Sequence, residues 1–123
     1  MRLKEKVSII TGAASGFGRG ISEKFSKEGA KLILTDINKD LLEKVSKDLN
    51  QDFFHTDVSN SSSMQKLSEY VIKKYGTIDI MVNNAGITHL PKPLEEVSEE
   101  EFDKVFAVNS KSVFLCGKFF VPQ

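Results

Sequence analysis

The chain has 123 residues, 40% of them apolar, and its 17 basic residues balance 17 acidic ones. This length suits one small domain. Because the basic residues are scattered, we expect neither nucleic acid nor a membrane surface as a partner. A single cysteine excludes an internal disulfide, and the apolar runs are too short for a signal peptide or for a membrane span of about 20 residues. We therefore expect a cytoplasmic protein.

Four short segments have the composition of buried strands: 7–10, 32–35, 52–56 and 78–82. They are largely apolar at both parities, as is typical of parallel strands covered by helices on both faces. Apolar residues at helical spacing follow each segment, and the first such stripe has Phe17, Ile21 and Phe25 at intervals of four. This alternation predicts an α/β fold with a doubly wound parallel sheet, built from four βα units in one domain over residues 1–123.

A glycine-rich turn, TGAASGFGRG, joins the first expected strand to the first expected helix. Gly12, Gly16 and Gly18 would let the backbone bend tightly and let a phosphate approach it. The free N–H groups and the positive dipole at the start of a helix favour such an anion. The turn therefore predicts a pyrophosphate-binding site, although a turn whose glycines serve packing alone remains an alternative.

Asp36 directly follows the second expected strand, eighteen residues after Gly18. A carboxylate in this place can accept hydrogen bonds from the ribose hydroxyls of an adenosine and would repel a 2′-phosphate. Ile37 follows it, and no basic residue stands between Gly12 and Gly18. These features favour NAD over NADP as the cofactor. The alternative is that Asp36 caps the next helix together with Asn38.

The glycine spacing and the later motifs resemble those of the classical short-chain dehydrogenases/reductases. The family's TGxxxGxG stands here at 11–18, Asp57-Val58 resembles its adenine-contacting pair, and residues 83–86 are its NNAG motif. The resemblance extends from Lys4 to Gln123 and looks greatest to 3-oxoacyl-carrier-protein reductases and sugar or polyol dehydrogenases. It implies a Rossmann fold and these cofactor-binding residues: Thr11, Gly12, Ser15, Gly16, Phe17, Gly18, Asp36, Ile37, Asp57, Val58, Asn84, Ala85 and Gly86.

Asn109 matches the asparagine of the family's Asn-Ser-Tyr-Lys catalytic tetrad. It lies in an apolar stripe of the last expected helix, formed by Phe102, Phe106, Val113, Cys116 and Phe120. Burial of an unpaired amide would cost about 2 kcal/mol or more, so we expect Asn109 to be hydrogen-bonded. The resemblance implies that its partners include a water leading toward the catalytic lysine. A structural amide that bends the helix is the alternative.

The other tetrad residues, a serine, a tyrosine and a lysine, come from later segments in the family, so here they would lie beyond residue 123. The resemblance therefore implies the N-terminal half of an oxidoreductase that transfers hydride between a nicotinamide cofactor and a carbonyl or secondary alcohol. A homo-oligomer or a complementing chain is the expected partner. An inactive NAD-binding or oligomerising fragment remains an alternative, as does another doubly wound enzyme, such as a methyltransferase.

Other reactive side chains favour structural interpretations. Tyr70 and Lys74 satisfy a YxxxK spacing, but they end a helix at the edge of the sheet opposite to ligand sites, so we expect solvated surface residues. His55 and His89 have no Cys or carboxylate at ligand spacing, so we expect no metal site. Cys116 lies in the apolar stripe of the last helix and is interpreted as a packed thiol.

Overall fold

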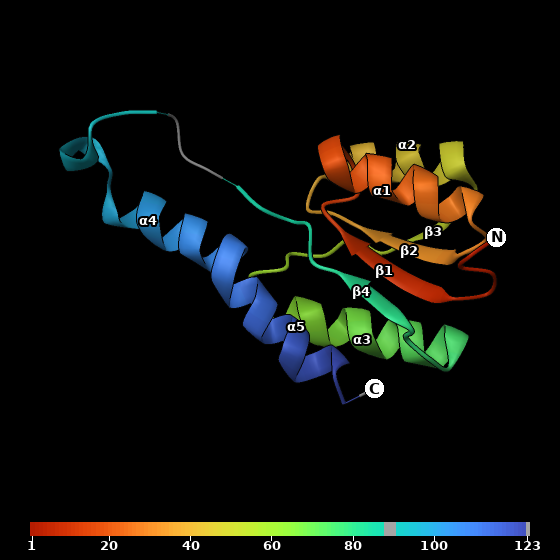
Figure 1. Ribbon diagram of the computed structural model, residues 1–123. Coiled ribbons are helices and arrows are strands. Elements are labelled where there is room, and N and C mark those ends of the chain that lie inside the picture. The colour runs from red at the N-terminus through yellow and green to blue at the C-terminus, as the bar shows by residue number, and fades with distance from the viewer. Residues whose placement is uncertain (88–90, 123) are drawn as a thin grey trace.

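The computed structural model describes residues 1–87 and 91–122, and a four-stranded parallel sheet lies at its centre (Figure 1). The strand order is β3-β2-β1-β4, with β1 at Val7–Thr11, β2 at Lys31–Thr35, β3 at Asp52–Phe53 and β4 at Ile80–Val82. All five residues of β1 are buried because the strand is paired on both edges and covered on both faces. The parallel sheet predicted from the sequence is confirmed.

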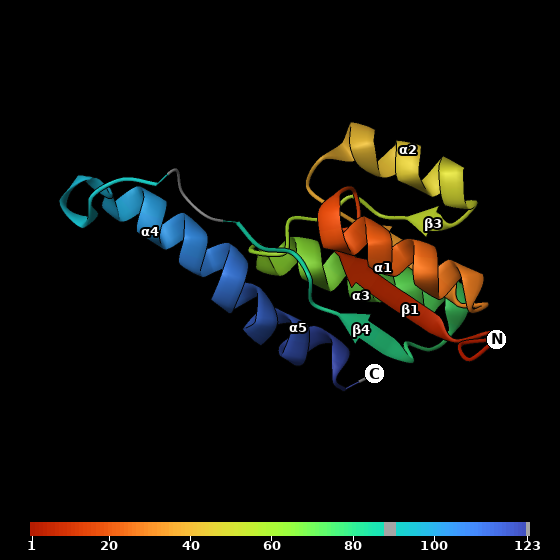
Figure 2. The ribbon, with the colours of Figure 1, turned by 45° about the horizontal axis from the view of Figure 1, so that its top comes forward.

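Helices cover both faces of the sheet (Figures 1 and 2). Because neighbouring strand residues point to opposite faces, the core is divided into two clusters. Ile10 and Leu34 pack with Leu42 in one cluster, and Ile9 and Ile33 lie in the other. The first cluster lies beneath α1 and α2, and the second beneath α3 and α5, with bounds at Gly16–Lys27 (α1), Lys39–Leu49 (α2), Ser61–Tyr75 (α3) and Ser112–Phe120 (α5).

Polar caps fix the helices that follow β2 and β3. The side chain of Asn38 accepts a hydrogen bond from the Leu41 N–H at 3.2 Å at the start of α2. Asn60 accepts one from the Ser63 N–H at 2.9 Å at the start of α3. Gly76 ends α3 in the left-handed conformation, with φ of 78°. The turns between these strands and helices are thereby held at the carboxyl edge of the sheet.

The last helical region is divided into η1 (Leu94–Glu96), α4 (Glu99–Phe106), a π-helical segment η2 (Ala107–Lys111) and α5. The predicted last helix is continuous from Glu99 to Phe120 apart from its change to π-helical geometry, but the prediction that its apolar stripe is buried along its whole length is wrong. Phe102 and Phe106 on α4 are 62% and 58% exposed, and Val113 is also exposed, whereas Cys116 and Phe120 are buried. Apolar periodicity shows which residues share one face of a helix, but it does not show whether another element packs against that face. Here α4 extends away from the sheet (Figure 1).

Two smaller features differ from the prediction. β3 ends at Phe53 instead of residue 56, although the Phe54 N–H still donates to the Leu34 carbonyl at 2.9 Å. β3 is an edge strand, so it has a pairing partner on one side of the sheet order alone. Phe17, expected in the buried stripe of α1, is 87% exposed. No helix of the described residues is long and apolar enough to cross a membrane.

Candidate functional site

A cleft of about 360 Å³ lies where the parallel strands end. Ligands of open parallel sheets bind at this carboxyl edge, because the turns that leave neighbouring strands diverge there. The walls come from the turns after all four strands and from the α4–η2 region. The described lining residues are Gly12, Ser15, Asp36, Ile37, Thr56, Asp57, Val58, Asn84, Ala85, Gly86, Ile87, Lys104 and Val108.

The glycine turn forms one wall and has the backbone that a phosphate cradle needs. Gly12 and Gly16 have φ of 65° and 56°, values that strain other residues. A Cβ at Gly18 would lie 1.9 Å from the Gly12 carbonyl oxygen, so α1 can begin directly against the turn because residue 18 is glycine. Ser15, the N-cap residue, makes no side-chain cap hydrogen bond within the described structure. The first N–H groups of α1 can therefore serve an anion.

Thr11 connects this turn to the segment after β4. Its hydroxyl donates to the Val82 carbonyl at 3.2 Å and accepts from the N–H groups of Asn84 and Ala85, both at 2.9 Å. The Asn84 side-chain amide donates in turn to the carbonyls of Thr11 and Gly12 at 3.2 and 3.3 Å. Thr11 is buried and does not line the cleft, but it holds the residues that do.

Asp36 joins the turn after β1 to the turn after β2. Its Oδ2 accepts from the Ala14 N–H at 3.1 Å, and its Oδ1 accepts from the Asn38 N–H at 2.9 Å. The cap of α2 is Asn38, so Asp36 is not the capping residue. Each carboxylate oxygen can accept a further hydrogen bond, because an ionised carboxylate has about four acceptor positions. The neighbouring Ile37 side chain is 65% exposed and lines the same part of the cleft.

Asp57 and Val58 form the wall that follows β3. The Asp57 Oδ1 accepts from the backbone N–H of Ser59 at 3.0 Å and from its hydroxyl at 2.6 Å, which fixes the carboxylate. Val58 is 7% exposed and belongs to the core cluster against which Val108 of η2 packs. Val58 and Val108 thus belong to one apolar core and both line the cleft.

Asn109 lies in η2 and holds the backbone of Ile87. Its Oδ1 accepts from the Ile87 N–H at 2.8 Å, and its Nδ2 donates to the Ile87 carbonyl at 2.7 Å. The expectation of a hydrogen-bonded amide is confirmed, but the expected burial is wrong because Asn109 is exposed. The side chain therefore fixes the backbone of Ile87, which follows Gly86 and lines the cleft. The water-mediated path toward a lysine stays a prediction.

A family model described as short chain dehydrogenase matches residues 6–123. The chain belongs to the short-chain dehydrogenase family. An uncharacterised oxidoreductase of Bacillus subtilis is 39% identical over an alignment of 126 residues, which covers 98% of this chain and 46% of that protein. The 3-oxoacyl-[acyl-carrier-protein] reductase FabG of Thermotoga maritima is 40% identical over 127 residues, an alignment that covers 99% of this chain and 51% of that protein.

Solved structures show the same relationship. A crystal structure of the 3-ketoacyl-(acyl-carrier-protein) reductase from Brucella melitensis, complexed with NADH, matches with a TM-score of 0.93 at 38% identity. The match covers 97% of this chain and 50% of that one. The short-chain dehydrogenase fold inferred from the motifs is confirmed, as is the similarity to 3-oxoacyl reductases. The chain spans about half the length of the relatives it matches.

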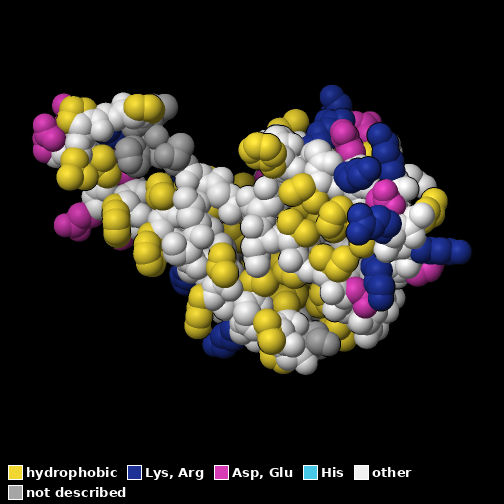
Figure 3. Space-filling view, in the orientation of Figure 1, with side chains coloured by type: hydrophobic (Ala, Val, Ile, Leu, Met, Phe, Trp, Pro, Cys, Tyr) yellow, Lys and Arg dark blue, Asp and Glu magenta, His cyan; other side chains and the backbone are white. Residues whose placement is uncertain are grey.

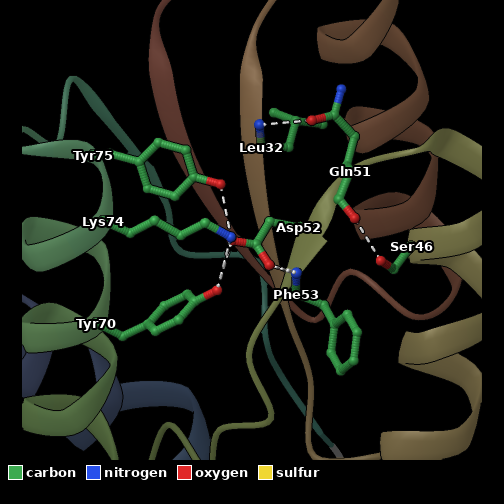
Figure 4. A network of polar contacts seen from close by, with 8 residues as sticks. All are labelled: Leu32, Ser46, Gln51, Asp52, Phe53, Tyr70, Lys74 and Tyr75. Carbon is green, nitrogen blue, oxygen red and sulfur yellow. Dashed lines mark hydrogen bonds and ion pairs between the residues drawn. The ribbon is translucent and has the colours of Figure 1, made fainter.

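The YxxxK pair is not part of the cleft lining, and it contacts Asp52 at the start of β3, whereas the cleft lies where the strands end (Figure 4). Asp52, the first residue of β3, accepts on Oδ2 from the hydroxyls of Tyr70 and Tyr75 at 2.7 and 2.8 Å and from Lys74 Nζ at 2.9 Å. Tyr70 is half-buried, so its description as a solvated surface residue is wrong. The pair ties α3 to β3.

The electrostatics of this cluster suit a structural role. Burial opposes ionisation of Asp52, but hydrogen bonds from Lys74, Tyr70 and Tyr75 outweigh it and lower the pKa of the carboxyl. Burial and the neighbouring Asp52 carboxylate raise the pKa of Tyr75 to about 12. Tyr70 also has a raised pKa, mainly through burial and its bond to Asp52. A tyrosine with a raised pKa is a poorer proton donor near neutral pH.

The remaining candidates are the two histidines and the single cysteine. No group of three or more His, Cys, Asp or Glu residues that could hold a metal occurs among the described residues. The His55 ring lies 2.8 Å from the Ile37 carbonyl, and His89 lies outside the described residues. Cys116 is 6% exposed, and burial raises the pKa of its thiol, as expected for a packed core residue.

The cleft contains most of the residues that the motifs indicate. Gly12, Ser15, Asp36, Ile37, Asp57, Val58, Asn84, Ala85 and Gly86 line it, whereas Thr11, Gly16, Phe17 and Gly18 do not. Sequence reasoning did not identify Thr56, Ile87, Lys104 or Val108. Ile87 directly follows the NNAG motif, and Lys104 and Val108 are four residues apart on one helical region, so the spacing was a usable signal.

Proposed function

We propose that the chain is the NAD-binding part of a dehydrogenase that transfers hydride between a nicotinamide ring and a carbonyl or secondary alcohol. The observation that carries this proposal is the cleft at the carboxyl edge of the sheet, bounded by the glycine turn, Asp36 and Asn84. The NADH complex of the similar Brucella reductase supports a nicotinamide cofactor. The residues also fit such a group, since Gly12 and Ser15 line the cleft and the Ser15 side chain caps no N–H group at the start of α1 in the described structure.

Each wall has a distinct role in this proposal. The turn at Gly12–Gly18 and the start of α1 receive the pyrophosphate. Asp36 and Ile37 hold the adenosine ribose, and Asp57 and Val58 lie along the adenine. Asn84–Gly86 and Ile87, fixed by Thr11 and Asn109, orient the nicotinamide end. The bound nicotinamide ring supplies or receives the hydride, and these residues bind and position it.

NAD is the proposed cofactor in preference to NADP, because the Asp36 carboxylate would lie beside the adenosine ribose. A ribose 2′-hydroxyl can donate a hydrogen bond to a carboxylate oxygen. A 2′-phosphate would instead add about 1.5 to 2 negative charges near a fixed negative charge. The open acceptor positions of Asp36 support this preference.

Titration of the purified protein with NADH and with NADPH, followed by nicotinamide fluorescence, tests the proposal. We expect saturable binding that is tighter for NADH than for NADPH. The Asp36→Ala variant should bind NADH more weakly and should no longer discriminate between the two cofactors. Asp40→Ala, which removes an exposed carboxylate of α2 outside the cleft lining, is the control and should bind as the unaltered protein does. Equal affinity for both cofactors, or no binding of either, would contradict the proposal.

A second function, association without hydride transfer, is favoured by an apolar surface over the last helical region (Figure 3). Large exposed apolar side chains gather there: Leu94, Phe102, Phe106, Val113, Phe114 and Val121. Such a surface is characteristic of an interface, here with a second copy or a complementing chain. Light scattering of a Phe106→Ser/Phe114→Ser variant tests this function, because loss of the apolar contact should lower the mass of the assembly. An unchanged mass would contradict it.

A further inference from the structure

A lysine on α4 belongs to the cleft but has no place in the roles described above. Lys104 and Val108 both line the cleft, four residues apart, so they lie on one face of the helical region. Val108 packs against the core cluster that contains Val58. Val58 follows Asp57 in the wall after β3. Lys104 therefore lines the same cleft as Asp36 and Asp57, one helical turn from a residue that packs against the core.

The charge of Lys104 is distinctive in this setting. It is the one basic residue among the described lining residues, and it faces a cleft with two carboxylates, Asp36 and Asp57. Among the described residues, no carboxylate oxygen lies within 4 Å of its Nζ, whereas Lys92 pairs with Glu101 at 2.6 Å. Both cleft carboxylates already accept hydrogen bonds from neighbouring backbone groups. The ammonium is thus available to an anionic ligand.

We propose that Lys104 is a specificity-determining residue that favours phosphorylated adenosine and so limits the preference for NAD that Asp36 imposes. This inference rests on the proposed function. A 2′-phosphate adds about 1.5 to 2 negative charges at neutral pH, so a nearby cation stabilises the phosphorylated ligand more than the unphosphorylated one. The attraction acts over about 8 Å at physiological ionic strength, so it does not require a direct contact.

Calorimetric titration with 5′-AMP and with 2′,5′-ADP tests this role, because the two probes differ by the 2′-phosphate. We expect Lys104→Gln to weaken the binding of 2′,5′-ADP relative to that of 5′-AMP by about fivefold, the size expected for unit charges about 4 Å apart in water. Lys104→Arg should keep the ratio of the two dissociation constants, for 2′,5′-ADP and for 5′-AMP, at the value of the unaltered protein. Lys111→Gln is the matched control, since it removes one charge from an exposed position of η2 outside the cleft lining.

Each result has a definite meaning. An equal change of the ratio in the Lys104 and Lys111 variants would overturn the inference, because net charge would then explain it. If Lys104→Gln weakened the binding of both probes equally, the inference would also be overturned, since Lys104 would then act on the adenosine 5′-phosphate that the two probes share. If the protein binds NADH but Lys104→Gln leaves the ratio unchanged, the inference alone fails. If it binds neither NADH nor the two probes, the proposed function fails as well.

Discussion

The hydroxyl of Thr11 accepts the backbone N–H of Asn84, and the side chain of Asn84 donates to the carbonyl of Thr11. The two residues are 73 positions apart, and they lie at the ends of neighbouring strands β1 and β4. The bonds hold the glycine turn and the NNAG segment at a fixed separation. The shape of the cleft therefore depends on a side chain that does not line it.

Thr11→Val should test this dependence directly. The substitution keeps the volume but leaves the N–H groups of Asn84 and Ala85 without their acceptor. Because Thr11 is 1% exposed, we expect the free energy of unfolding to fall by about 2 kcal/mol or more. Urea denaturation measures the change. Thr11→Ser retains the hydroxyl, so its free energy of unfolding should fall much less. Equal stability of the two variants would contradict this explanation.

The close approach of α1 to the glycine turn predicts a large difference between two alanine substitutions. A Cβ at Gly18 would lie 1.9 Å from the Gly12 carbonyl oxygen, so Gly18→Ala should displace the turn and abolish NADH binding. Gly20 lies in the same helix, and a Cβ there would meet no described heavy atom within 4 Å. Gly20→Ala should raise the free energy of unfolding by about 0.5 to 1 kcal/mol. Thermal denaturation and NADH titration of both variants measure this, and tight binding by Gly18→Ala would be the contrary outcome.

Asp52→Asn should destabilise the attachment of α3 to β3. An amide has no charge and a single acceptor oxygen, so it cannot accept from the Phe53 N–H and also from Tyr70, Tyr75 and Lys74, and we expect a loss of about 2 kcal/mol at pH 7. The pKa of Asp52 is lowered in the folded protein, so its stabilisation is present above the unfolded pKa of about 3.9 and is lost as the pH falls below it. Urea denaturation at several pH values should show the two proteins converging below about pH 4. A difference that stays constant with pH would exclude the ionised carboxylate as the cause.

The alkaline limb of the stability profile should depend on Tyr75. Its pKa is about 12 in the folded protein and about 10 when unfolded, so the neutral phenol stabilises the fold below pH 10. This stabilisation should decline as the pH rises from about 10 to about 12. Tyr75→Phe cannot ionise and should show a shallower decline in chemical denaturation across that range. Identical slopes for the two proteins would argue against the assigned role of Tyr75.

Asn109→Ala should impair the cleft more than the fold. The substitution removes both hydrogen bonds to Ile87. Because the Asn109 side chain is exposed, the free energy of unfolding should change by less than about 1 kcal/mol. We expect the dissociation constant for NADH to rise by about tenfold because the backbone of Ile87 is no longer fixed. Ser110→Ala, at the exposed neighbouring position, should bind normally. Unchanged NADH affinity in Asn109→Ala would show that Ile87 needs no such support.

The sequence was sufficient for the sheet and for most of the cleft, because both depend on local patterns. The buried strands are short apolar runs, and the glycine turn and Asp36 directly follow two of them. The exposure of Phe102 and of Phe106 could not be predicted, since periodicity does not reveal which face lacks a neighbour. The cluster around Asp52 was also missed because it joins side chains 18 to 23 positions apart. Lys104 was missed for a similar reason, since the cleft that it lines is formed by segments far apart in the sequence.

If the cleft at the carboxyl edge of the sheet binds the dinucleotide, NADH should perturb the residues around it. Amide chemical shifts of the isotope-labelled protein, recorded during an NADH titration, measure this residue by residue. We expect saturable shifts at Gly12, Gly18, Asp36 and Asn84, with none in the Tyr70–Tyr75 segment at the opposite edge. Shifts centred on Tyr70–Tyr75, or none at saturating NADH, would contradict it.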